Sequence, residues 1–370
     1  MKDYLVTPWE VRGDVDYDDL IERFGTERIK PEMVKRIERL AGDSHLFLRR
    51  QLYFSHRDLG WLLDQYEKGI NFSLYTGRGP SGNTHIGHLV PFIFTKWLQD
   101  RFDAPLYFQM TDDEKFLVKE MKLEETTSFA YENALDVIAC GFDPKKTKIF
   151  ANTDYIHTLY KTALKVSKRV TFSTAKAVFG FKNSTNIGQI FFPSIQAVPA
   201  FLESIEKGEN RPCLIPCAID QDPYWRITRD VAPKLGFYKP AAIHNKFVPG
   251  LGKGGKMSAS KPETCIFSTD EPEEAKKKVM KAFTGGKVDL EEQKREGGNP
   301  EICSVFAYYA AIFEEDDKKL LERRKMCKAG EIMCGECKAV LAERVAEFLK
   351  KHQERREKAK DRLDEFLVKD

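Results

Sequence analysis

The sequence predicts an α/β fold in which a doubly wound parallel sheet is followed by an α-helical C-terminal domain. Two observations support this prediction. Between residues 71 and 248, short apolar runs typical of buried strands alternate with helical segments, which is the pattern of a parallel sheet covered on both faces. From about Glu291 onward the strand pattern disappears, and the remaining segments have helical spacing.

The first 70 residues are predicted to form an N-terminal extension that starts extended and continues as short helices. Residues 16–25 and 31–42 have helical apolar spacing, with Pro31 suited to a first turn and Gly42 to a helix end. A sheet domain over residues 71–285 is predicted to follow this extension.

The sheet domain alternates strands with helices along the chain. Strands are predicted at residues 71–77, 104–110, 148–152, 212–218 and 241–248. Helices are predicted at residues 88–102, 126–142 and 222–236, and a mostly helical insertion at about 154–205.

Residues 286–370 are predicted to form the helical C-terminal domain. Its longest segment, residues 337–367, has many Glu/Lys and Glu/Arg neighbours four residues apart and reads as a solvated amphipathic helix. The net charge of the chain is only +3, but residues 318–370 carry 16 Lys and Arg against 11 Asp and Glu. The positive excess is therefore C-terminal, a mild indication of contact with a polyanion.

No apolar run in the sequence predicts a signal peptide or a membrane span. The eight cysteines lack the spacing of a disulfide framework, and we expect a reducing cytoplasm. Cys334 and Cys337, with Cys327 nearby, are candidate zinc ligands. Because only one C-x-x-C is present and no His pair follows it, the sequence favours cysteines without a metal.

The segment 76–88, TGRGPSGNTHIGH, contains two nucleotide-binding patterns. Its G-x-G-x-x-G is the fingerprint of dinucleotide-binding enzymes, which also require an acidic residue at the end of the next strand. Asp100 and Asp103 instead precede the strand predicted at 104–110, so the sequence disfavours a dehydrogenase. Failure to bind NAD would exclude that interpretation.

The H-I-G-H pattern fits the segment better. His85 and His88 lie where the glycine loop enters a helix, so their ring N–H groups and free backbone amides converge on a place that suits a phosphate. Gly87 lets an adenine or a ribose approach the backbone. Two histidines at a helix start can also be solvated caps, so this pattern alone leaves both interpretations open.

A second glycine-rich loop, GKGGKMSAS at residues 252–260, follows the last predicted strand. Lys256 offers a cation, and Ser258 and Ser260 offer hydroxyl groups to a phosphate. Alone, this loop reads as a flexible surface segment. H-I-G-H followed about 170 residues later by K-M-S-A-S is strong evidence for chemistry at a nucleotide phosphate.

These two motifs resemble those of the class I aminoacyl-tRNA synthetases, and the chain is most similar to the tryptophanyl-tRNA synthetases of the eukaryotic and archaeal type. The resemblance extends over nearly the whole chain. It includes FLRRQLYFSHRD, LYTGRGPSGNTHIGHLVPFIFTKWLQD, QMTDDEK, CAIDQDPYWRITRDVAP and KMSAS.

The resemblance implies a Rossmann-like catalytic domain at 71–285 and an anticodon-binding domain at 286–370. It implies ATP-dependent activation of L-tryptophan to the adenylate and transfer to tRNA(Trp), with release of pyrophosphate and AMP. We expect Mg²⁺ to accompany ATP, and expect no tightly bound metal, no editing domain and a cytoplasmic homodimer.

The resemblance also assigns roles to individual residues. The expected catalytic residues are His85, His88, Lys256 and Ser258. The expected ATP-binding residues are Gly77, Arg78, Gly87, Asp220, Met257 and Ser260. The expected tryptophan-binding residues are Tyr75, Gln109, Glu114, Gln196 and Gln221, of which Tyr75 and Gln109 accept the indole N–H.

Three other functions remain open on the sequence. A tyrosyl-tRNA synthetase shares the fold and the motifs, although Tyr75 with Gln109 favours tryptophan. A small nucleotidyltransferase with an H-x-G-H motif would not need the K-M-S-A-S loop. A catalytically silent paralogue would not need its histidines or Lys256. We further expect the segment TPWEV, residues 7–11, to fold over a groove, for which the ATP site is the candidate.

Overall fold

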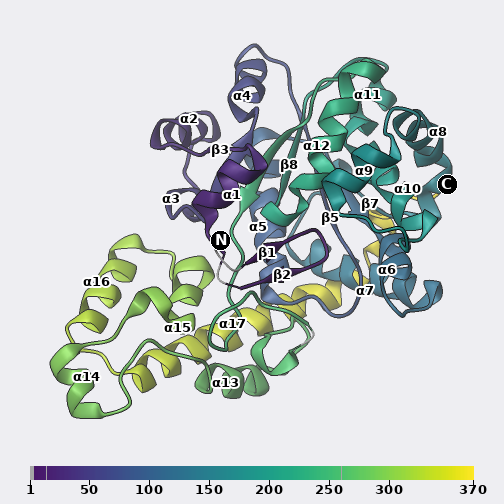
Figure 1. The fold of residues 1–370 in the computed structure, drawn as a ribbon. Helices are drawn as coiled ribbons and strands as arrows, with labels where there is room; N and C mark the ends of the chain where they lie inside the picture. Colours follow the sequence, from purple (N-terminus) through teal and green to yellow (C-terminus); the bar gives the residue numbers. More distant parts are fainter. Residues whose placement is uncertain (1–3, 14, 260) are drawn as a thin grey trace.

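The computed structural model describes residues 4–13, 15–259 and 261–370. Its centre is a seven-stranded sheet with the order β3-β4-β9-β8-β5-β6-β7 (Figure 1). These strands are β3 (Glu27–Arg28), β4 (Tyr53–Arg57), β5 (Ser73–Arg78), β6 (Leu106–Met110), β7 (Thr147–Ala151), β8 (Cys213–Ala218) and β9 (Ala241–Asn245).

The five strands from β9 to β7 are parallel, which confirms the predicted Rossmann-like sheet. The chain runs outward from β5 through β6 to β7, then crosses back to β8 and β9 on the other side of β5. This is the strand order of a doubly wound fold, and the direction of winding reverses between β5 and β8. Ligands of such folds bind at the carboxyl ends of the strands at this reversal.

Helices cover both faces of the sheet because successive strand residues point to opposite sides. Leu74 of β5 packs into a core on one face and Tyr75 into a core on the other. The first face is covered by α2 (Pro31–Ala41), α4 (Leu59–Glu67), α5 (Ile86–Phe102) and α7 (Leu123–Ala139). The second is covered by α8 (Ile156–Ser167), α9 (Phe172–Phe179), α10 (Ile187–Gln196) and α12 (Asp222–Val231). The expected helical insertion is thus confirmed, and it is completed by α11 (Leu202–Lys207).

Two strands that the sequence did not predict extend the sheet from the N-terminal side. β4 pairs antiparallel with β9, and β3 pairs antiparallel with β4. The strand β4 lacks an apolar alternation because it carries the buried polar residues Ser55 and His56. Ser55 Oγ lies 3.1 Å from Nδ1 of His244 in β9, so the buried Ser55 hydroxyl has a hydrogen-bond partner on the neighbouring strand. The domain boundary at residue 70 remains a prediction. The sheet extends across it, because β3 and β4 precede this residue and β5 to β9 follow it.

The rest of the N-terminal region contains a hairpin and short helices. β1 (Leu5–Val6) pairs antiparallel with β2 (Val11–Arg12). Before and after α2 lie α1 (Tyr17–Phe24) and α3 (Leu46–Arg49). Between β6 and α7 lies α6 (Asp112–Val118). Among the described residues, none of the helices has the length and apolar character that crossing a membrane requires.

The C-terminal region is helical, as predicted. It contains α13 (Pro272–Met280), α14 (Leu290–Glu296), α15 (Ser304–Tyr308), α16 (Asp317–Lys328) and α17 (Cys334–Lys360). α17 is not the solvated helix that its charges indicate, because it packs along α13 and α7 (Figure 1). After α17 the chain reaches the edge of the sheet, where Ile149 N–H donates to Phe366 O at 2.8 Å and Val368 N–H donates to Ile149 O at 2.9 Å.

A buried charged cluster joins α17 to α7. Asp136 of α7 is 1% exposed, and its Oδ1 lies 2.9 Å from Nε2 of His352. Its Oδ2 lies 2.6 Å from Nη1 of Arg356, whose side chain is 9% exposed. Burial alone would raise the pKa of Asp136, but the hydrogen bond from His352 and the charge of Arg356 lower it below its usual value.

We predict that Asp136→Ala lowers the free energy of unfolding by about 3–5 kcal/mol, because it removes the buried carboxylate that both His352 and Arg356 contact and leaves Arg356 only its exposed partner Glu132. Chemical denaturation would measure this change. The control is Glu347→Ala, which removes an exposed ion pair with Lys351 within α17 and should leave the denaturation midpoint nearly unchanged. A loss below about 1 kcal/mol for Asp136→Ala would contradict the prediction.

Candidate functional site

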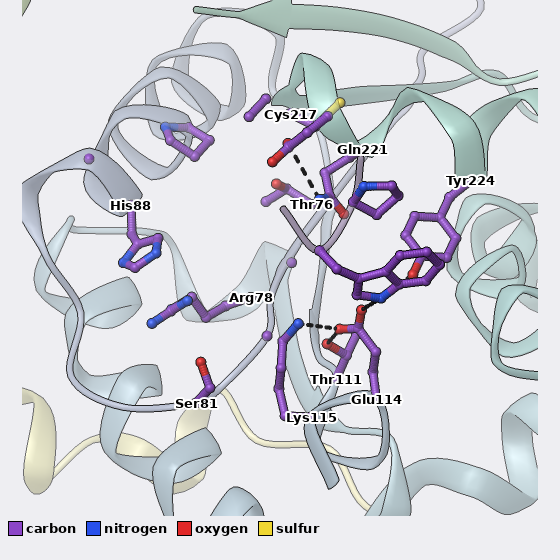
Figure 2. A pocket seen from close by; sticks show the side chains of 18 of the residues that line it. Thr76, Arg78, Ser81, His88, Thr111, Glu114, Lys115, Cys217, Gln221 and Tyr224 are labelled. Carbon is purple, nitrogen blue, oxygen red and sulfur yellow. Dashed lines mark hydrogen bonds and ion pairs between the residues drawn. The ribbon is translucent and has the colours of Figure 1, made fainter. Parts of the chain in front are cut away.

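A cavity of about 410 Å³ opens where β5 and β8 end. Its walls come from the glycine loop after β5, the start of α5, the loop after β8, and the loop that contains Lys256. This is the winding reversal at which a doubly wound sheet binds ligands. Figure 2 shows Arg78, His88 and Lys115 reaching into this space from different elements.

Most of the residues expected from the sequence line this cavity. They are Gly77, Arg78, His85, Gly87, His88, Glu114, Gln196, Asp220, Gln221, Lys256 and Met257. Ser258 follows Met257 in the same loop and is not part of the cavity lining. Ser260 lies outside the described residues.

The two histidines of H-I-G-H form a stacked pair, with ring centroids 3.4 Å apart. The backbone N–H of His85 donates to Nδ1 of His88 at 3.2 Å. Because Nδ1 of His88 accepts this bond, the ring proton of the neutral imidazole is on Nε2. Nδ1 of His85 is buried without a hydrogen-bond partner among the described residues.

Both histidines are neutral at physiological pH. Burial, followed by the charges of Arg78 and Lys256, lowers the pKa of His85 to about 3. Burial, followed by Arg78 and His85, lowers the pKa of His88 well below its ordinary value. The rings therefore act as hydrogen-bond donors or acceptors rather than as cations.

Cations surround the histidine pair. Burial lowers the pKa of Arg78 only to about 10, so it stays charged, and its Nε has no partner among the described residues. Burial, then Lys115 and Arg78, also lowers the pKa of Lys119, which lines the same cavity. A Cβ on Gly79 would lie 2.0 Å from Cε of Lys115, so glycine makes room for that lysine. This end of the cavity suits a polyanion.

Two glycines keep the backbone accessible beside the histidines. A Cβ on Gly87 would lie 3.2 Å from the ring of His85 and 3.7 Å from Cβ of Met257. A Cβ on Gly77 would lie 2.6 Å from the backbone oxygen of Gln109 in the neighbouring strand. Any side chain at Gly77 would therefore force β5 and β6 apart.

The K-M-S-A-S loop reaches the cavity through Lys256. Its Nζ lies 3.5 Å from Oδ2 of Asp220 and 5.0 Å from the ring centroid of Phe247. Burial raises the pKa of Asp220, although the charge of Lys256 opposes this shift. Nε2 of Gln221 donates to Oδ1 of Asp220 at 3.4 Å. The buried carboxyl group therefore suits hydroxyl donors, such as those of a ribose.

Glu114 is the central group at the other end of the cavity. Its Oε1 accepts from Trp9 Nε1 and from Tyr224 OH, both at 3.2 Å. Its Oε2 accepts from Thr111 Oγ1 at 3.1 Å and lies 2.7 Å from Nζ of Lys115. Figure 2 shows Glu114 between Tyr224 and Lys115.

The segment TPWEV covers this end of the cavity, as expected, but at the Glu114 side rather than beside the histidines. Trp9 lies in the turn between β1 and β2 and lines the cavity together with Pro8. Its ring contacts those of Phe179, Phe181 and Tyr224, with centroids 5.8–6.5 Å apart.

Gln196 supplies an acceptor that the folded chain does not use. It is 7% exposed and lines the cavity, and its Oε1 has no partner among the described residues. A buried acceptor without a donor costs about 1–3 kcal/mol, so a donor from a ligand, such as an ammonium group, would stabilise the site.

Tyr75 and Gln109 lie behind the cavity wall rather than on it. Tyr75 OH is 2.5 Å from Gln109 Oε1 and 2.9 Å from Gln196 O. Nε2 of Gln109 donates to Asn152 Oδ1 at 2.8 Å, and Asn152 donates in turn to Asp113. This chain of bonds fixes the Gln109 amide with its oxygen toward Tyr75. Burial raises the pKa of Asp113, the last member of the chain, to about 7.

Three contributions were not identified from the sequence. Lys115 and Lys119 line the cationic end, and Tyr224 holds Glu114. Lys115 lies in α6, the helix after strand β6, and Lys119 follows that helix, so their position near the carboxyl edge of the sheet was the available signal for them. Tyr224 is in α12, where the sequence indicated only an apolar helix face.

Comparison with known families gives one matching family model, described as tRNA synthetases class I (W and Y), over residues 67–350. The tryptophan–tRNA ligase of Thermococcus kodakarensis is 55% identical over 370 residues, covering 99% of this chain and 94% of the relative.

Solved structures give the same result. The tryptophanyl-tRNA synthetase of Plasmodium falciparum has a TM-score of 0.87 and 42% identity, over 93% of this chain and 94% of that one. That of Encephalitozoon cuniculi bound to tryptophan has a TM-score of 0.88 and 39% identity, over 96% and 98%. The chain therefore belongs to the class I tRNA synthetases, among the tryptophanyl-tRNA synthetases of the archaeal and eukaryotic type.

Proposed function

We propose that the cavity at the ends of β5 and β8 is where this ATP-dependent ligase activates L-tryptophan and transfers it to tRNA(Trp). The observation that carries the proposal is the division of a single cavity into a cationic end at Arg78 and Lys256 and an amino-acid end at Glu114 and Gln196. Tryptophan and the triphosphate would then lie side by side, which converts their reaction into one between positioned groups.

In the first step, a carboxylate oxygen of tryptophan attacks the α-phosphorus of ATP and pyrophosphate departs. His85, His88 and Lys256, with Ser258, stabilise the charge that gathers on the phosphates, and Arg78 assists them. A bound triphosphate would raise the pKa of both histidines by attraction. ATP enters with Mg²⁺ held by its phosphate oxygens, which is how this ion is commonly bound in nucleotide sites.

The adenosine is held by the groups on the opposite wall. Asp220 accepts from the ribose hydroxyls, while Gly77 and Gly87 let the nucleotide approach the backbone. Met257 packs beside Gly87 and so borders the same space. The resemblance adds Ser260 to this set.

The amino acid is recognised at both of its ends. Glu114, Gln196 and Gln221 hold the ammonium group, for which the unpartnered Oε1 of Gln196 is the clearest support. Tyr75 and Gln109 accept the indole N–H. Tyr75 OH donates to Gln109 Oε1 at 2.5 Å, and lone pairs on both oxygens remain available for this further donor. Access to them from the cavity requires the indole to displace part of the intervening wall.

In the second step, a ribose hydroxyl at the 3′ end of tRNA(Trp) attacks the carbonyl of the adenylate and AMP departs. We place the anticodon contact on the helical region 286–370. The reaction belongs in the cytoplasm, where a reducing environment also keeps all eight cysteines free.

We predict that the purified chain catalyses ATP–pyrophosphate exchange with tryptophan alone among the twenty amino acids, and that it charges tRNA(Trp). Lys256→Ala should lower the rate of exchange about 10²- to 10³-fold because it removes a cation from the transition state. Lys253→Ala, which changes an exposed lysine of the same loop, is the matched control and should keep nearly full activity.

The outcomes of the exchange and charging assays distinguish among the candidate functions. Exchange with tyrosine would refute the assignment of Tyr75 and Gln109, and a folded chain without exchange would be a silent paralogue. Equal losses in the two lysine variants would contradict a specific role for Lys256. Exchange without charging would refute the transfer step.

We predict that Tyr75→Phe lowers kcat/KM for tryptophan by about tenfold to a hundredfold while the KM for ATP stays unchanged. The variant leaves the indole N–H with one fewer acceptor in a buried site, which costs about 1–3 kcal/mol. The control is Tyr107→Phe, whose hydroxyl bonds Glu203 and Glu206 away from the cavity. A similar loss of kcat/KM in both variants would show that removing either hydroxyl disturbs the packing of the core, and would contradict a specific contact of Tyr75 with the indole.

We propose that the chain works as a homodimer through the exposed face of α8. Ile156, Tyr160 and Leu164 are 37%, 48% and 45% exposed and recur every four residues, so they form one apolar stripe. Such a stripe on a helix of the insertion is suited to a self-complementary contact.

We predict that the chain sediments as a dimer and that Leu164→Glu makes it a monomer, because the variant places a charge in the apolar contact. Leu321→Glu, at an exposed leucine of α16, should leave the dimer intact. A monomeric parent chain, or a Leu164→Glu variant that still forms a dimer, would disprove this interface.

A further inference from the structure

A line of hydrogen-bonded side chains runs behind the amino-acid end of the cavity, and the proposed function uses only one end of it. Tyr75 OH donates to Gln109 Oε1 at 2.5 Å. Nε2 of Gln109 donates to Asn152 Oδ1 at 2.8 Å, and Nδ2 of Asn152 donates to Asp113 Oδ1 at 2.8 Å. Asn152 and Asp113 do not line the cavity, so they act on a ligand only through the other two residues.

The inner members of this line are closed to solvent. Tyr75, Gln109 and Asn152 are 1%, 0% and 0% exposed, while Asp113 at the outer end is half-buried. A buried amide that faced the wrong partner would leave a donor or an acceptor without a bond, and solvent could not replace that bond. Each amide is therefore held in one orientation.

The direction of every bond in the line is set at its Asp113 end. The backbone N–H of Glu114 donates to Asp113 Oδ1 at 2.8 Å, so this oxygen is an acceptor. The Asn152 atom that faces it is consequently the amide nitrogen, and the amide oxygen of Asn152 faces the opposite way. Only the amide nitrogen of Gln109 donates to that oxygen, which turns Oε1 of Gln109 toward Tyr75.

The other end of the line holds more acceptors than hydrogens. Besides its contact with Gln109 Oε1, Tyr75 OH lies 2.9 Å from the backbone oxygen of Gln196. A phenol carries one hydrogen, whereas amide and peptide oxygens carry none, so three oxygens share a single hydrogen. One further donor would complete this group. An indole N–H is a donor without lone pairs and meets that need.

Other bonds hold the line in place, so it does not depend on a ligand to form. The backbone N–H of Asn152 donates to Met110 O at 3.0 Å. Asp112, which is 0% exposed, accepts from the backbone N–H of Thr153 at 3.3 Å and from Thr127 Oγ1 at 2.9 Å. The end of β7 is thereby fastened to α6 and α7. Support of this kind holds a binding group in one geometry.

We propose that Asn152 and Asp113 are positioning residues that make the amino-acid end of the cavity selective for a ring N–H donor. They hold the Gln109 amide with its oxygen forward and do not touch the amino acid. With that amide reversed, Nε2 would face the indole N–H, and two donors would oppose one another. The proposal rests on the proposed function, in which Tyr75 and Gln109 accept the indole N–H.

The test compares tryptophan with benzothienylalanine, in which sulfur replaces the indole N–H, in ATP–pyrophosphate exchange by the full chain. The two amino acids share the same ammonium and carboxylate groups, so the ratio of their kcat/KM values reports on the N–H alone. We expect the parent chain to prefer tryptophan by at least about tenfold, because a site built for a donor rejects an analogue that lacks it.

Asn152→Leu keeps a side chain of similar size but leaves Nε2 of Gln109 without its acceptor, so the Gln109 amide is free to reverse. We expect kcat/KM for tryptophan to fall about tenfold, while kcat/KM for benzothienylalanine falls less than about threefold. The KM for ATP should stay unchanged. Asp113→Ala, which frees the Asn152 amide, should lower the ratio in the same direction. Asp113→Asn keeps an acceptor oxygen and should retain most of it.

The matched control is Gln99→Leu, at a buried amide near the opposite end of β7. Gln99 is 2% exposed, its Nε2 donates to Thr147 Oγ1 at 2.9 Å, and its Oε1 accepts from Asp143 N–H at 2.9 Å. This variant also removes the bonds of a buried amide, but outside the line behind the cavity. The ratio of the two kcat/KM values should therefore stay at that of the parent chain.

The failure of the positioning role differs from the failure of the proposed function. A parent chain that prefers tryptophan, with the same ratio in Asn152→Leu, overturns the role of Asn152 and leaves Tyr75 and Gln109 as the acceptors. Equal losses for both amino acids also overturn it, since they show a disturbed core. A parent chain that uses both amino acids equally refutes the contact with the indole N–H itself.

Circular dichroism establishes whether each variant folds. If Asn152→Leu does not fold, Asp113→Ala decides, because its side chain is only half-buried and the ratio is independent of any effect on the ammonium site. A lowered ratio in Asp113→Ala that Asp113→Asn restores supports the proposal, and an unchanged ratio in Asp113→Ala overturns it.

Discussion

The reversal of winding between β5 and β8 is the constraint on which the rest of the site depends. After β5 the chain turns into α5 on one face of the sheet, and after β8 it turns toward α12 on the other. Because the two turns lead to opposite faces, the segments that follow β5 and β8 do not cover the carboxyl ends of these strands. A cavity is left at the edge, and the glycine loop, the Asp220 turn and the Lys256 loop all border it.

Electrostatics then divides this cavity into two ends. Arg78, Lys115 and Lys256 face neutral histidines at one end, and burial prevents water from neutralising their field. The carboxylates Glu114 and Asp220 balance only part of this charge, so this end of the cavity suits a polyphosphate. At the other end, Glu114 accepts from Trp9 and Tyr224, which ties the N-terminal hairpin to the proposed amino-acid pocket. An ammonium group placed there would compete with Trp9 for the same carboxylate oxygen.

The C-terminal helix supports the site from behind the sheet. His352 and Arg356 of α17 hold Asp136 of α7, and Asn133 on the same helix donates to the backbone oxygen of Gly82 at 3.2 Å. The glycine loop that presents the histidines therefore rests on α7, which in turn rests on α17. A helix at the far end of the chain thus contributes to the placement of a loop near residue 82, although it lines no part of the cavity.

The sequence by itself determined the parallel sheet, the order of its helices and the two glycine-rich loops that border the cavity. Apolar periodicity and glycine spacing are local properties, and the two loops are contiguous stretches such as residues 76–88 and 252–260. The resemblance also led to Glu114, Gln196 and Asp220, each of which lines the cavity. Glu114 and Asp220 lie shortly after strand ends, where a local signal exists, whereas Gln196 is the last residue of α10 and was assigned through the resemblance alone.

Only the tertiary structure decided which distant groups meet. The polar residues Ser55 and His56 hid strand β4, whose partner β9 lies almost two hundred residues further along the chain. The charges of α17 indicated a solvated helix, but Asp136 pairs with two of its polar side chains and lets it be buried. Contacts between segments remote in sequence leave no local periodicity, and they form only when the packing of the core brings those segments together.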